Sequence, residues 1–435
     1  MSVKPVAVVT GIGIAAPNGL GTDAYWASTL EGRSGIGRIT RFDPKDYPAV
    51  LAGELPGFDP ARYLSDRLLP QTDRVTQISL AVTDWALADA AADPKRLSEY
   101  DMGVVTASAS GGFEFGQREL ENLWSKGRRY VSAYQSFAWF YAVNTGQISI
   151  RHGMRGPSSA LVTEQAGGLD ALAQARRQIR AGTPFMLAGG VDASLCPWGW
   201  VAQLAGGRLS RSEDPARAYL PFETRACGFV PGEGGAILVL EDKDAARARK
   251  APNMYGEIAG YAASFDPAPG SGRSSALRRA IQAALDDAEA DPSEVDAVFA
   301  DGAGLPGPDK DEAQALSAVF GPYGVPVTVP KSMTGRLYSG GASLDVAAAL
   351  LALQDGILPA TAHVSRPSPD LEIDLVVGEP RRIALRTVLV IARGEGGFNS
   401  ALVVRAPAGS PGSATVPAHQ NQTHTSHGSI GGNNA

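Results

Sequence analysis

Short apolar runs alternate with longer segments of helical periodicity along the chain. A helical segment over residues 74–91 precedes an apolar run at 102–107, and a second such pair lies at 274–290 and 295–300. Apolar runs of about four to eight residues are typical of buried strands, and longer runs with a helical period are typical of helices. The pattern predicts an α/β protein whose helices cover largely buried sheets.

The order of these elements occurs twice. Each half continues with a glycine pair that opens an Ala-rich helix and then with a glycine-led strand: 167–180 and 234–240 in the first half, 340–355 and 396–404 in the second. We predict duplicated halves over residues 1–255 and 256–406. Because helices rich in Ala and Gly can approach closely, we expect a pair of them between two sheets, in a layered α-β-α-β-α arrangement.

Composition narrows the function classes. The 435 residues carry 39 Lys+Arg against 45 Asp+Glu, a net charge of −6, which argues against binding to nucleic acid or to an anionic membrane. The sequence contains no apolar run of the length of a membrane span and no N-terminal signal segment, so we expect a cytoplasmic protein. Residues 407–435 are rich in Gly, Ser, Thr, Asn and Gln, and are predicted to be a disordered tail.

Histidine and cysteine are scarce, and this limits the possible chemistry. The chain has two cysteines, and three of its five histidines fall in the predicted tail, which leaves His152 and His363 in the folded body. We therefore expect no metal site and no cofactor.

Two segments resemble β-ketoacyl synthases. Residues 221–234 (PFETRACGFVPGEG) are similar to the stretch before the last strand of that family's first half, and residues 327–335 (VTVPKSMTG) are similar to its lysine-containing loop. Together with the duplicated pattern, the resemblance covers about residues 5–405. It implies the thiolase-type fold of the condensing enzymes.

The resemblance also locates a catalytic triad that is missing here. Condensing members of the family use one cysteine and two histidines, and these positions are matched by Gln165, Asp301 and Arg336. An amide cannot form an acyl thioester, so covalent catalysis at Gln165 is excluded. Asp301 and Arg336 replace residues that converge on one pocket, and we expect them to form an ion pair that fills it.

These departures resemble one branch of the family, the chain length factors or β subunits of type II aromatic polyketide synthases. Three stretches of sequence carry this resemblance: TEQAGGLD at 163–170, TGRLYSGG at 334–341 and ARGEGGFNS at 392–400. The resemblance implies a non-condensing subunit that lines the tunnel setting poly-β-ketone chain length. It also implies a heterodimer with a ketosynthase α subunit, and an acyl carrier protein that brings the chain on phosphopantetheine. Whether the chain is an enzyme by itself stays open, because Gln165 could instead assist decarboxylation of malonyl carrier protein by hydrogen bonding to the thioester oxygen.

The resemblance places the tunnel end at Phe113, Gly116 and Leu120, whose spacing puts them on one face of a helix. Gly116 has no side chain and Leu120 is smaller than an aromatic residue, so a roomy tunnel and a long product are expected. The segment around residues 135–144 is dense in aromatic residues. Phe137, Trp139 and Phe140 are therefore predicted to contribute to the subunit interface.

Overall fold

The computed structural model describes residues 4–268 and 270–407. Apart from residue 407, the predicted tail lies outside these residues. Among the described residues, no helix combines the length and the apolar character that crossing a bilayer requires.

The first half of the chain builds a mixed set of strands in the order β6-β5-β7-β8-β1. β5 runs parallel to β6 and β7, whereas β8 runs antiparallel to both β7 and β1. The strands are β1 (Ala7–Ala16), β5 (Met102–Ala107), β6 (Ser158–Leu161), β7 (Phe185–Asp192) and β8 (Gly234–Asp242).

The second half repeats this arrangement in the order β11-β10-β15-β16-β9, with the same parallel and antiparallel neighbours. Its strands are β9 (Gly256–Phe265), β10 (Ala297–Phe299), β11 (Pro326–Thr328), β15 (Thr387–Gly394) and β16 (Phe398–Arg405), with β13 (Asp374–Leu375) at the edge. The two sets join at β1 and β9, where Val8 pairs with Glu257. The predicted duplicated α/β fold is confirmed, and β9 begins at Gly256, where the sequence was divided.

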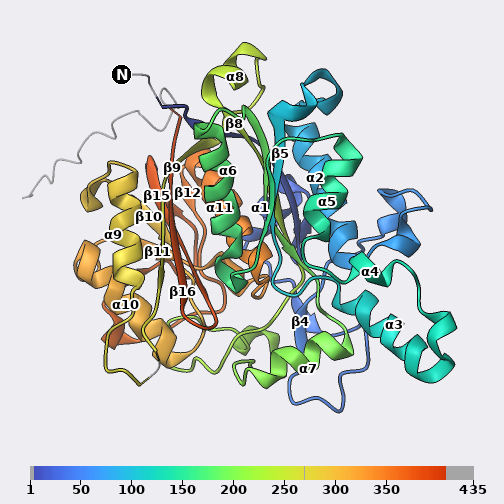
Figure 1. Ribbon diagram of the computed structural model, residues 1–435. Helices are drawn as coiled ribbons and strands as arrows, with labels where there is room; N and C mark the ends of the chain where they lie inside the picture. The colour runs from blue at the N-terminus through green and yellow to red at the C-terminus, as the bar shows by residue number, and fades with distance from the viewer. Residues whose placement is uncertain (1–3, 269, 408–435) are drawn as a thin grey trace, which may run out of the picture.

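Helices form three layers around these strands (Figure 1). α2 and α5 cover the outer side of the first set, α9 and α10 cover the outer side of the second, and α6 and α11 lie between the two sets. The helices are α2 (Arg74–Asp89), α5 (Val143–His152), α6 (Gly167–Arg180), α9 (Leu277–Asp287), α10 (Pro306–Phe320) and α11 (Ser339–Asp355). This is the expected α-β-α-β-α arrangement.

Glycine at the start of each central helix permits the close packing of this layer. A Cβ atom on Gly168 would lie 2.5 Å from the backbone of Ser339 and of Ser343, and one on Gly340 would collide with the carbonyl oxygen of Gly234. The glycine pairs in the sequence therefore mark where α6 and α11 approach each other and the sheet. The first turns of α6 and α11 therefore lie against each other in the core.

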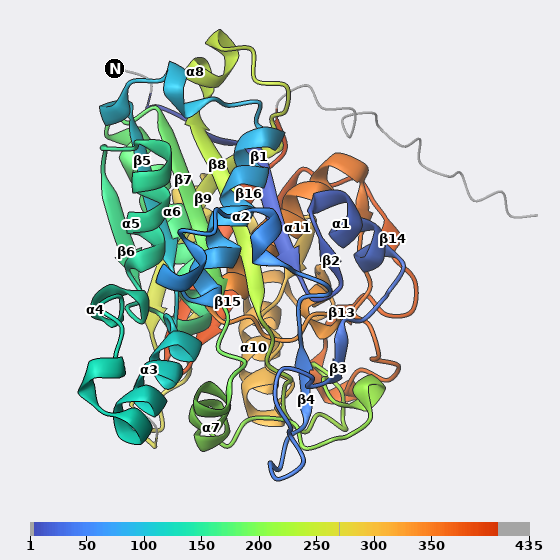
Figure 2. The same cartoon turned by 90° about the vertical axis from the view of Figure 1, so that its right-hand side faces the viewer.

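α3 (Phe113–Lys126), α4 (Gln135–Ala138) and α7 (Pro197–Ala205) lie beside the layered body (Figure 2). α3 contacts both α4 and α7. The remaining elements are α1 (Thr22–Leu30), α8 (Lys243–Ala248), β2 (Gly19–Leu20), β3 (Ile36–Arg38), β4 (Leu51–Gly53), β12 (Ile357–Leu358) and β14 (Arg381–Arg382).

Candidate functional site

Gln165 lies in a single helical turn, Glu164–Ala166, directly before α6. Its side chain is 0% exposed and packs against Gly341 at the start of α11, where a Cβ atom would lie 2.7 Å from Nε2. Neither amide atom has a hydrogen-bond partner among the described residues. Burying such a group without a partner costs about 1–3 kcal/mol.

Glu164 directs its carboxylate back toward the backbone. Its Oε2 accepts a hydrogen bond from the backbone N–H of Gln165 at 2.7 Å and another from that of Glu395 at 2.9 Å. Glu164 adopts φ +51°, in the left-handed region. Burial raises the pKa of its carboxyl group, and the nearby charge of Arg336 opposes that rise.

Asp301 and Arg336 form the expected ion pair. Two guanidinium nitrogens of Arg336 each lie 3.0 Å from a carboxylate oxygen of Asp301, and Arg336 also donates to the carbonyl oxygen of Arg393 at 3.1 Å. The guanidinium carbon lies 5.3 Å from the ring centre of Phe229. Burial alone would raise the pKa of Asp301, but the positive charge of Arg336 holds that pKa below its usual value.

Neighbouring polar residues bond to the backbone beside this pair. Glu312 accepts hydrogen bonds from the backbone N–H groups of Asp301 and Gly302 at 2.7 and 2.9 Å, and burial raises its pKa to about 7. Lys331 lies 2.7 Å from a carboxylate oxygen of Asp345 and donates to the carbonyl oxygen of Ala300 at 2.6 Å. Glu312 and Lys331 therefore hold the backbone of residues 300–302 beside the ion pair.

A cavity of about 420 Å³ opens beside this cluster. It is lined by Ala109, Ser110, Phe113, Glu164, Ser194, Ala202, Gln203, Ala205, Gly206, Arg208, Phe229, Arg336, Tyr338 and Glu395. Gln165 does not line this cavity, because Glu164 lies at its wall instead. None of the lining residues is a cysteine or a histidine, so the cavity lacks both a thiol nucleophile and an imidazole base.

The three predicted tunnel residues face different surroundings. Phe113 lines the inner cavity, whereas Leu120 lines an outer apolar groove of about 730 Å³ with Trp124 and Trp198. Gly116 lies beneath Trp198, where a Cβ atom would be 3.0 Å from the indole ring. The structure thus places Phe113 and Leu120 on opposite sides of Trp198.

Sequence reasoning missed Trp198. Its indole stacks on Phe113 with ring centres 4.8 Å apart and planes at 10°. Trp198 follows Pro197 at the start of α7, a segment far from α3 in the sequence. The available signal was a large aromatic residue next to a proline, six residues after the end of β7, but it did not identify the partner helix.

Two buried aspartates fix the start of α3. Asp73 accepts hydrogen bonds from the backbone N–H groups of Val75 at 2.8 Å and Phe115 at 2.7 Å, and burial raises its pKa to about 7. Asp192 accepts from Ser108 Oγ at 2.7 Å and from the backbone N–H of Ser339 at 3.0 Å. The Asp192 carboxylate therefore links the loop that leads into α3 to the start of α11.

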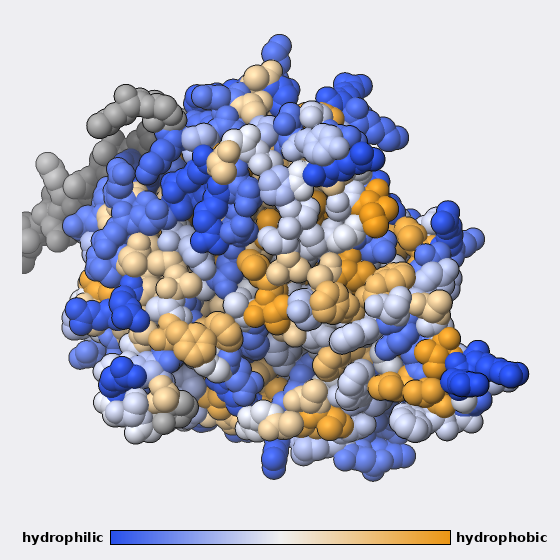
Figure 3. Space-filling view, viewed as in Figure 1, coloured by the Kyte–Doolittle hydropathy of each residue, from blue (hydrophilic) through white to orange (hydrophobic). Residues whose placement is uncertain are grey.

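The predicted interface aromatics lie at the surface. Trp139 is 47% exposed and Phe140 is 39% exposed, and Phe137 is half-buried against Tyr134. Figure 3 shows apolar side chains gathered over the region of α3 and its neighbours. These rings are available to contact another protein.

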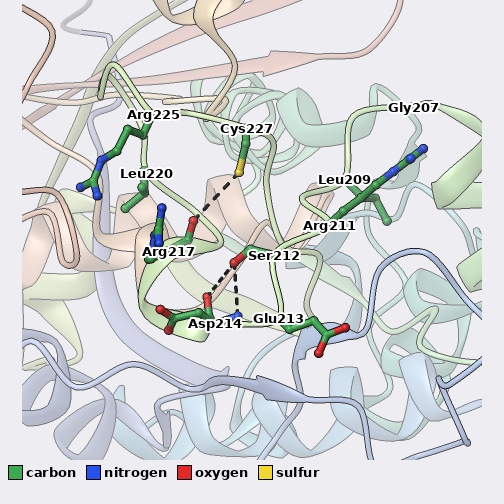
Figure 4. Close-up of a pocket in the computed structure, with 10 residues that line it drawn as sticks. All are labelled: Gly207, Leu209, Arg211, Ser212, Glu213, Asp214, Arg217, Leu220, Arg225 and Cys227. Carbon is green, nitrogen blue, oxygen red and sulfur yellow. Dashed lines mark hydrogen bonds between the residues drawn. The ribbon is translucent and has the colours of Figure 1, made fainter.

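A further pocket of about 570 Å³ lies in the loop over residues 207–227 (Figure 4). Arg211, Arg217 and Arg225 border it together with the exposed Cys227. Cys196 is buried, and the two cysteines form no disulfide. Among residues 4–268 and 270–407, no group of His, Cys, Asp and Glu could hold a metal ion.

Comparison with known proteins identifies the family. The model of the β-ketoacyl synthase N-terminal domain matches residues 4–246, and that of the C-terminal domain matches residues 255–365. The chain is 61% identical over 404 residues to the actinorhodin polyketide putative beta-ketoacyl synthase 2 of Streptomyces coelicolor, covering 93% of this chain and 99% of that protein. It is 60% identical over 406 residues to the tetracenomycin polyketide synthase ketoacyl synthase beta subunit of Streptomyces glaucescens, covering 93% and 99%.

Solved structures agree with this assignment. The ishigamide ketosynthase/chain length factor superposes with a TM-score of 0.86 at 27% identity, over 93% of this chain and 100% of that chain. A chain from a type II polyketide synthase acyl-carrier protein in complex with its ketosynthase bound to the hexaketide superposes with a TM-score of 0.83 at 26% identity, over the same shares.

Proposed function

Because the chain belongs to the β-ketoacyl synthase family, among the chain length factors or β subunits of type II aromatic polyketide synthases, we propose that it is the non-condensing half of a ketosynthase heterodimer. One observation carries this proposal: Asp301 and Arg336, at the two positions that the sequence resemblance matches to the histidines of condensing enzymes, form a buried ion pair. Gln165 supplies no nucleophile beside it. The chain therefore contributes structure to a complex whose chemistry takes place on its partner.

The partner we propose is a ketosynthase α subunit, which meets an acyl carrier protein carrying the growing chain on phosphopantetheine. The exposed rings of Trp139 and Phe140, with the half-buried Phe137, suit the core of that interface. A solved relative that includes an acyl-carrier protein supports the second partner. The unpaired thiols of Cys196 and Cys227 suit a reducing compartment, so we place the complex in the cytoplasm.

Chain length in this proposal depends on α3. Phe113 borders the inner cavity, and Gly116 and Leu120 follow it on the same helix. A poly-β-ketone grows by two carbons in each cycle, so the depth of the space that receives it limits its length. Because Gly116 has no side chain and Leu120 is smaller than an aromatic residue, we expect a deep space and a long product.

The alternative role, decarboxylation assisted by Gln165, is not favoured. The Gln165 amide is fully buried against Gly341 and does not line the cavity. A thioester oxygen in that cavity would meet Glu164 first. An amide that a substrate cannot reach cannot donate a hydrogen bond to it.

The proposal is tested by size-exclusion chromatography of the full chain with and without a ketosynthase α subunit, followed by intact-protein mass spectrometry after incubation with acyl carrier protein thioesters. We expect a stable heterodimer in which only the α subunit gains an acyl adduct. The acylated α subunit is the internal control for an active thioester. A stable acyl adduct on this chain, or failure to form a heterodimer, would contradict the proposal.

A further inference from the structure

Tyr338 directly precedes α11 and lines the 420 Å³ cavity. Its backbone adopts φ +51° and ψ −128°, a region that residues with a Cβ atom rarely enter. Glycine would adopt this conformation without a steric penalty. Backbone strain of this kind is concentrated at functional sites, where the surrounding structure imposes it. The side chain at this position is therefore a candidate for a role of its own.

Contacts on both sides of Tyr338 impose this conformation. The backbone N–H of Ser339 donates to the buried carboxylate of Asp192 at 3.0 Å, and Ser339 Oγ donates to the carbonyl oxygen of Glu164 at 2.8 Å. The carbonyl oxygen of Tyr338 accepts a hydrogen bond from the backbone N–H of Gly341 at 2.9 Å. These bonds fix the direction in which the side chain of Tyr338 leaves the backbone.

The hydroxyl of Tyr338 has no hydrogen-bond partner within residues 4–268 and 270–407. By contrast, the hydroxyls of Tyr219, Tyr255 and Tyr261 each donate to a protein oxygen, at 2.7, 2.9 and 2.7 Å. Buried tyrosine hydroxyls usually find an acceptor. The Tyr338 hydroxyl is therefore a donor that remains available to a ligand in the cavity.

The charges around this hydroxyl favour a neutral acceptor. Burial raises the pKa of the Tyr338 phenol, and so do the nearby carboxylates of Glu164, Asp192 and Glu395, whereas the guanidinium of Arg336 opposes the rise. The phenol therefore stays protonated and can donate at neutral pH. The same carboxylates would repel an anionic ligand, but they would not repel a ketone oxygen.

The rest of the cavity wall suits a carbon chain. Phe113 and Phe229 line it together with Ala109, Ala202 and Ala205. Ligand sites typically combine such an apolar wall with a few polar groups that fix the orientation of the ligand.

We propose that the Tyr338 hydroxyl donates a hydrogen bond to a ketone oxygen of the growing poly-β-ketone, which makes Tyr338 a further specificity-determining residue. A poly-β-ketone carries a ketone on every second carbon, so one of these oxygens can lie opposite the hydroxyl when the chain enters the cavity beside Phe113. A reduced alkyl chain offers no acceptor there. This inference rests on the proposed function, because that function supplies the poly-β-ketone.

The first test measures binding of nonan-2-one, a neutral ketone on an apolar chain, to the full-length protein by saturation-transfer NMR. Tyr338→Phe removes only the hydroxyl, and we expect its dissociation constant to be about two- to tenfold weaker than that of the wild type, the scale of one neutral hydrogen bond. Tyr255→Phe is the matched control. It removes a hydroxyl that bonds to Asp89, so it should lower the melting temperature and leave ketone binding unchanged.

The second test measures the products of the complex reconstituted with the α subunit and malonyl carrier protein. Tyr338→Phe should raise the share of products shorter than the wild-type length by about two- to tenfold, with the heterodimer intact in size-exclusion chromatography. Equal ketone affinity in the wild type and Tyr338→Phe, or no saturable ketone binding by the wild type, would overturn the inference. Failure to form a heterodimer would contradict the proposed function instead, because the NMR titration needs no partner.

Discussion

Phe113 and Trp198 stack face to face and together separate two spaces. The ring centres lie 4.8 Å apart with planes at 10°, with the 420 Å³ cavity on the side of Phe113 and the 730 Å³ groove on the side of Leu120. Gly116 lies directly beneath the indole ring. A side chain added at Gly116 would press against the indole ring, 3.0 Å from its Cβ atom, so we expect the residue at this place on α3 to affect the boundary between the two spaces.

The ion pair of Asp301 and Arg336 should contribute strongly to folding. Arg336→Met leaves the Asp301 carboxylate buried without its partner, and we expect the free energy of unfolding to fall by about 3–5 kcal/mol. Adding Asp301→Asn removes the unpaired charge and should restore much of that loss. Urea denaturation followed by circular dichroism measures both effects.

A surface pair provides the control for this measurement. Arg96 and Asp93 lie 3.5 Å apart and are exposed, so Arg96→Met should change the free energy of unfolding by less than about 0.5 kcal/mol. A similarly small loss for Arg336→Met would show that the buried pair of Asp301 and Arg336 does not stabilise the fold.

Gln165→Met should stabilise the chain. The substitution removes two buried polar atoms that lack partners and keeps a flexible side chain of similar length, so a gain of about 1 kcal/mol is expected. Product yield of the reconstituted complex should be unchanged. A stable variant whose complex loses most of its yield would instead assign the amide a part in the chemistry.

Restoring the thiol alone should not restore condensation. Gln165→Cys still lacks both imidazoles, because Asp301 and Arg336 stand at the positions that the resemblance matches to the histidines. Incubation of the isolated variant with acyl and malonyl carrier protein, followed by mass spectrometry of the products, should detect no chain extension. Extension without an α subunit would refute this explanation.

Stability should depend on pH through Asp73. Burial raises its pKa in the folded state to about 7, above the value of about 3.9 in an unfolded chain. The folded state therefore holds the extra proton, and this contribution to the free energy of unfolding declines as the pH rises from about 4 to 7. Asp73→Asn cannot ionise, so its free energy of unfolding should fall less over that range.

Thr72→Val is the control for the pH measurement. Thr72 donates a hydrogen bond to the carbonyl oxygen of Leu68 at 2.7 Å and does not titrate in this range. Its substitution should lower stability by the same amount at every pH. If the free energy of unfolding of Asp73→Asn falls with pH as steeply as that of the wild type, other carboxyl groups cause the pH dependence.

The elements that local patterns encode were predictable. Strand 102–107 and helix 167–180 have the observed bounds because hydrophobic periodicity and helix-opening glycines are properties of neighbouring residues. The Asp301–Arg336 pair was also predictable, because the two residues replace positions known to converge.

Contacts between elements that lie far apart in the sequence were not predictable. Trp198 meets Phe113 only because α7 folds across the start of α3, and no local pattern encodes that crossing. Glu164 also contacts Glu395 from a backbone conformation with φ +51°, which the local sequence does not indicate. For the same reason the sequence did not show that Phe113 and Leu120, which were expected to line one tunnel, line two different spaces.

Heterodimer formation should depend on the exposed rings. Trp139→Ala or Phe140→Ala should weaken binding to the α subunit by about 2–4 kcal/mol, the scale of an interface anchor. Neither substitution should lower the melting temperature of the isolated chain. Tyr100→Ala removes an exposed ring in the helical turn before β5 and should leave binding unchanged. Unaltered affinity of both Trp139→Ala and Phe140→Ala, measured by isothermal titration calorimetry, would exclude these rings as anchors.

The central claim is that α3 sets product length, and the mass distribution of polyketides from the reconstituted complex with malonyl carrier protein tests it most directly. Leu120→Phe, alone or with Gly116→Thr, should shorten the product by one or more two-carbon units, and Phe113→Ala should lengthen it or broaden its distribution. Leu120→Met conserves volume and should leave the length unchanged. If the Gly116→Thr/Leu120→Phe variant forms a stable, active heterodimer and still makes the wild-type length, α3 does not set chain length in this protein.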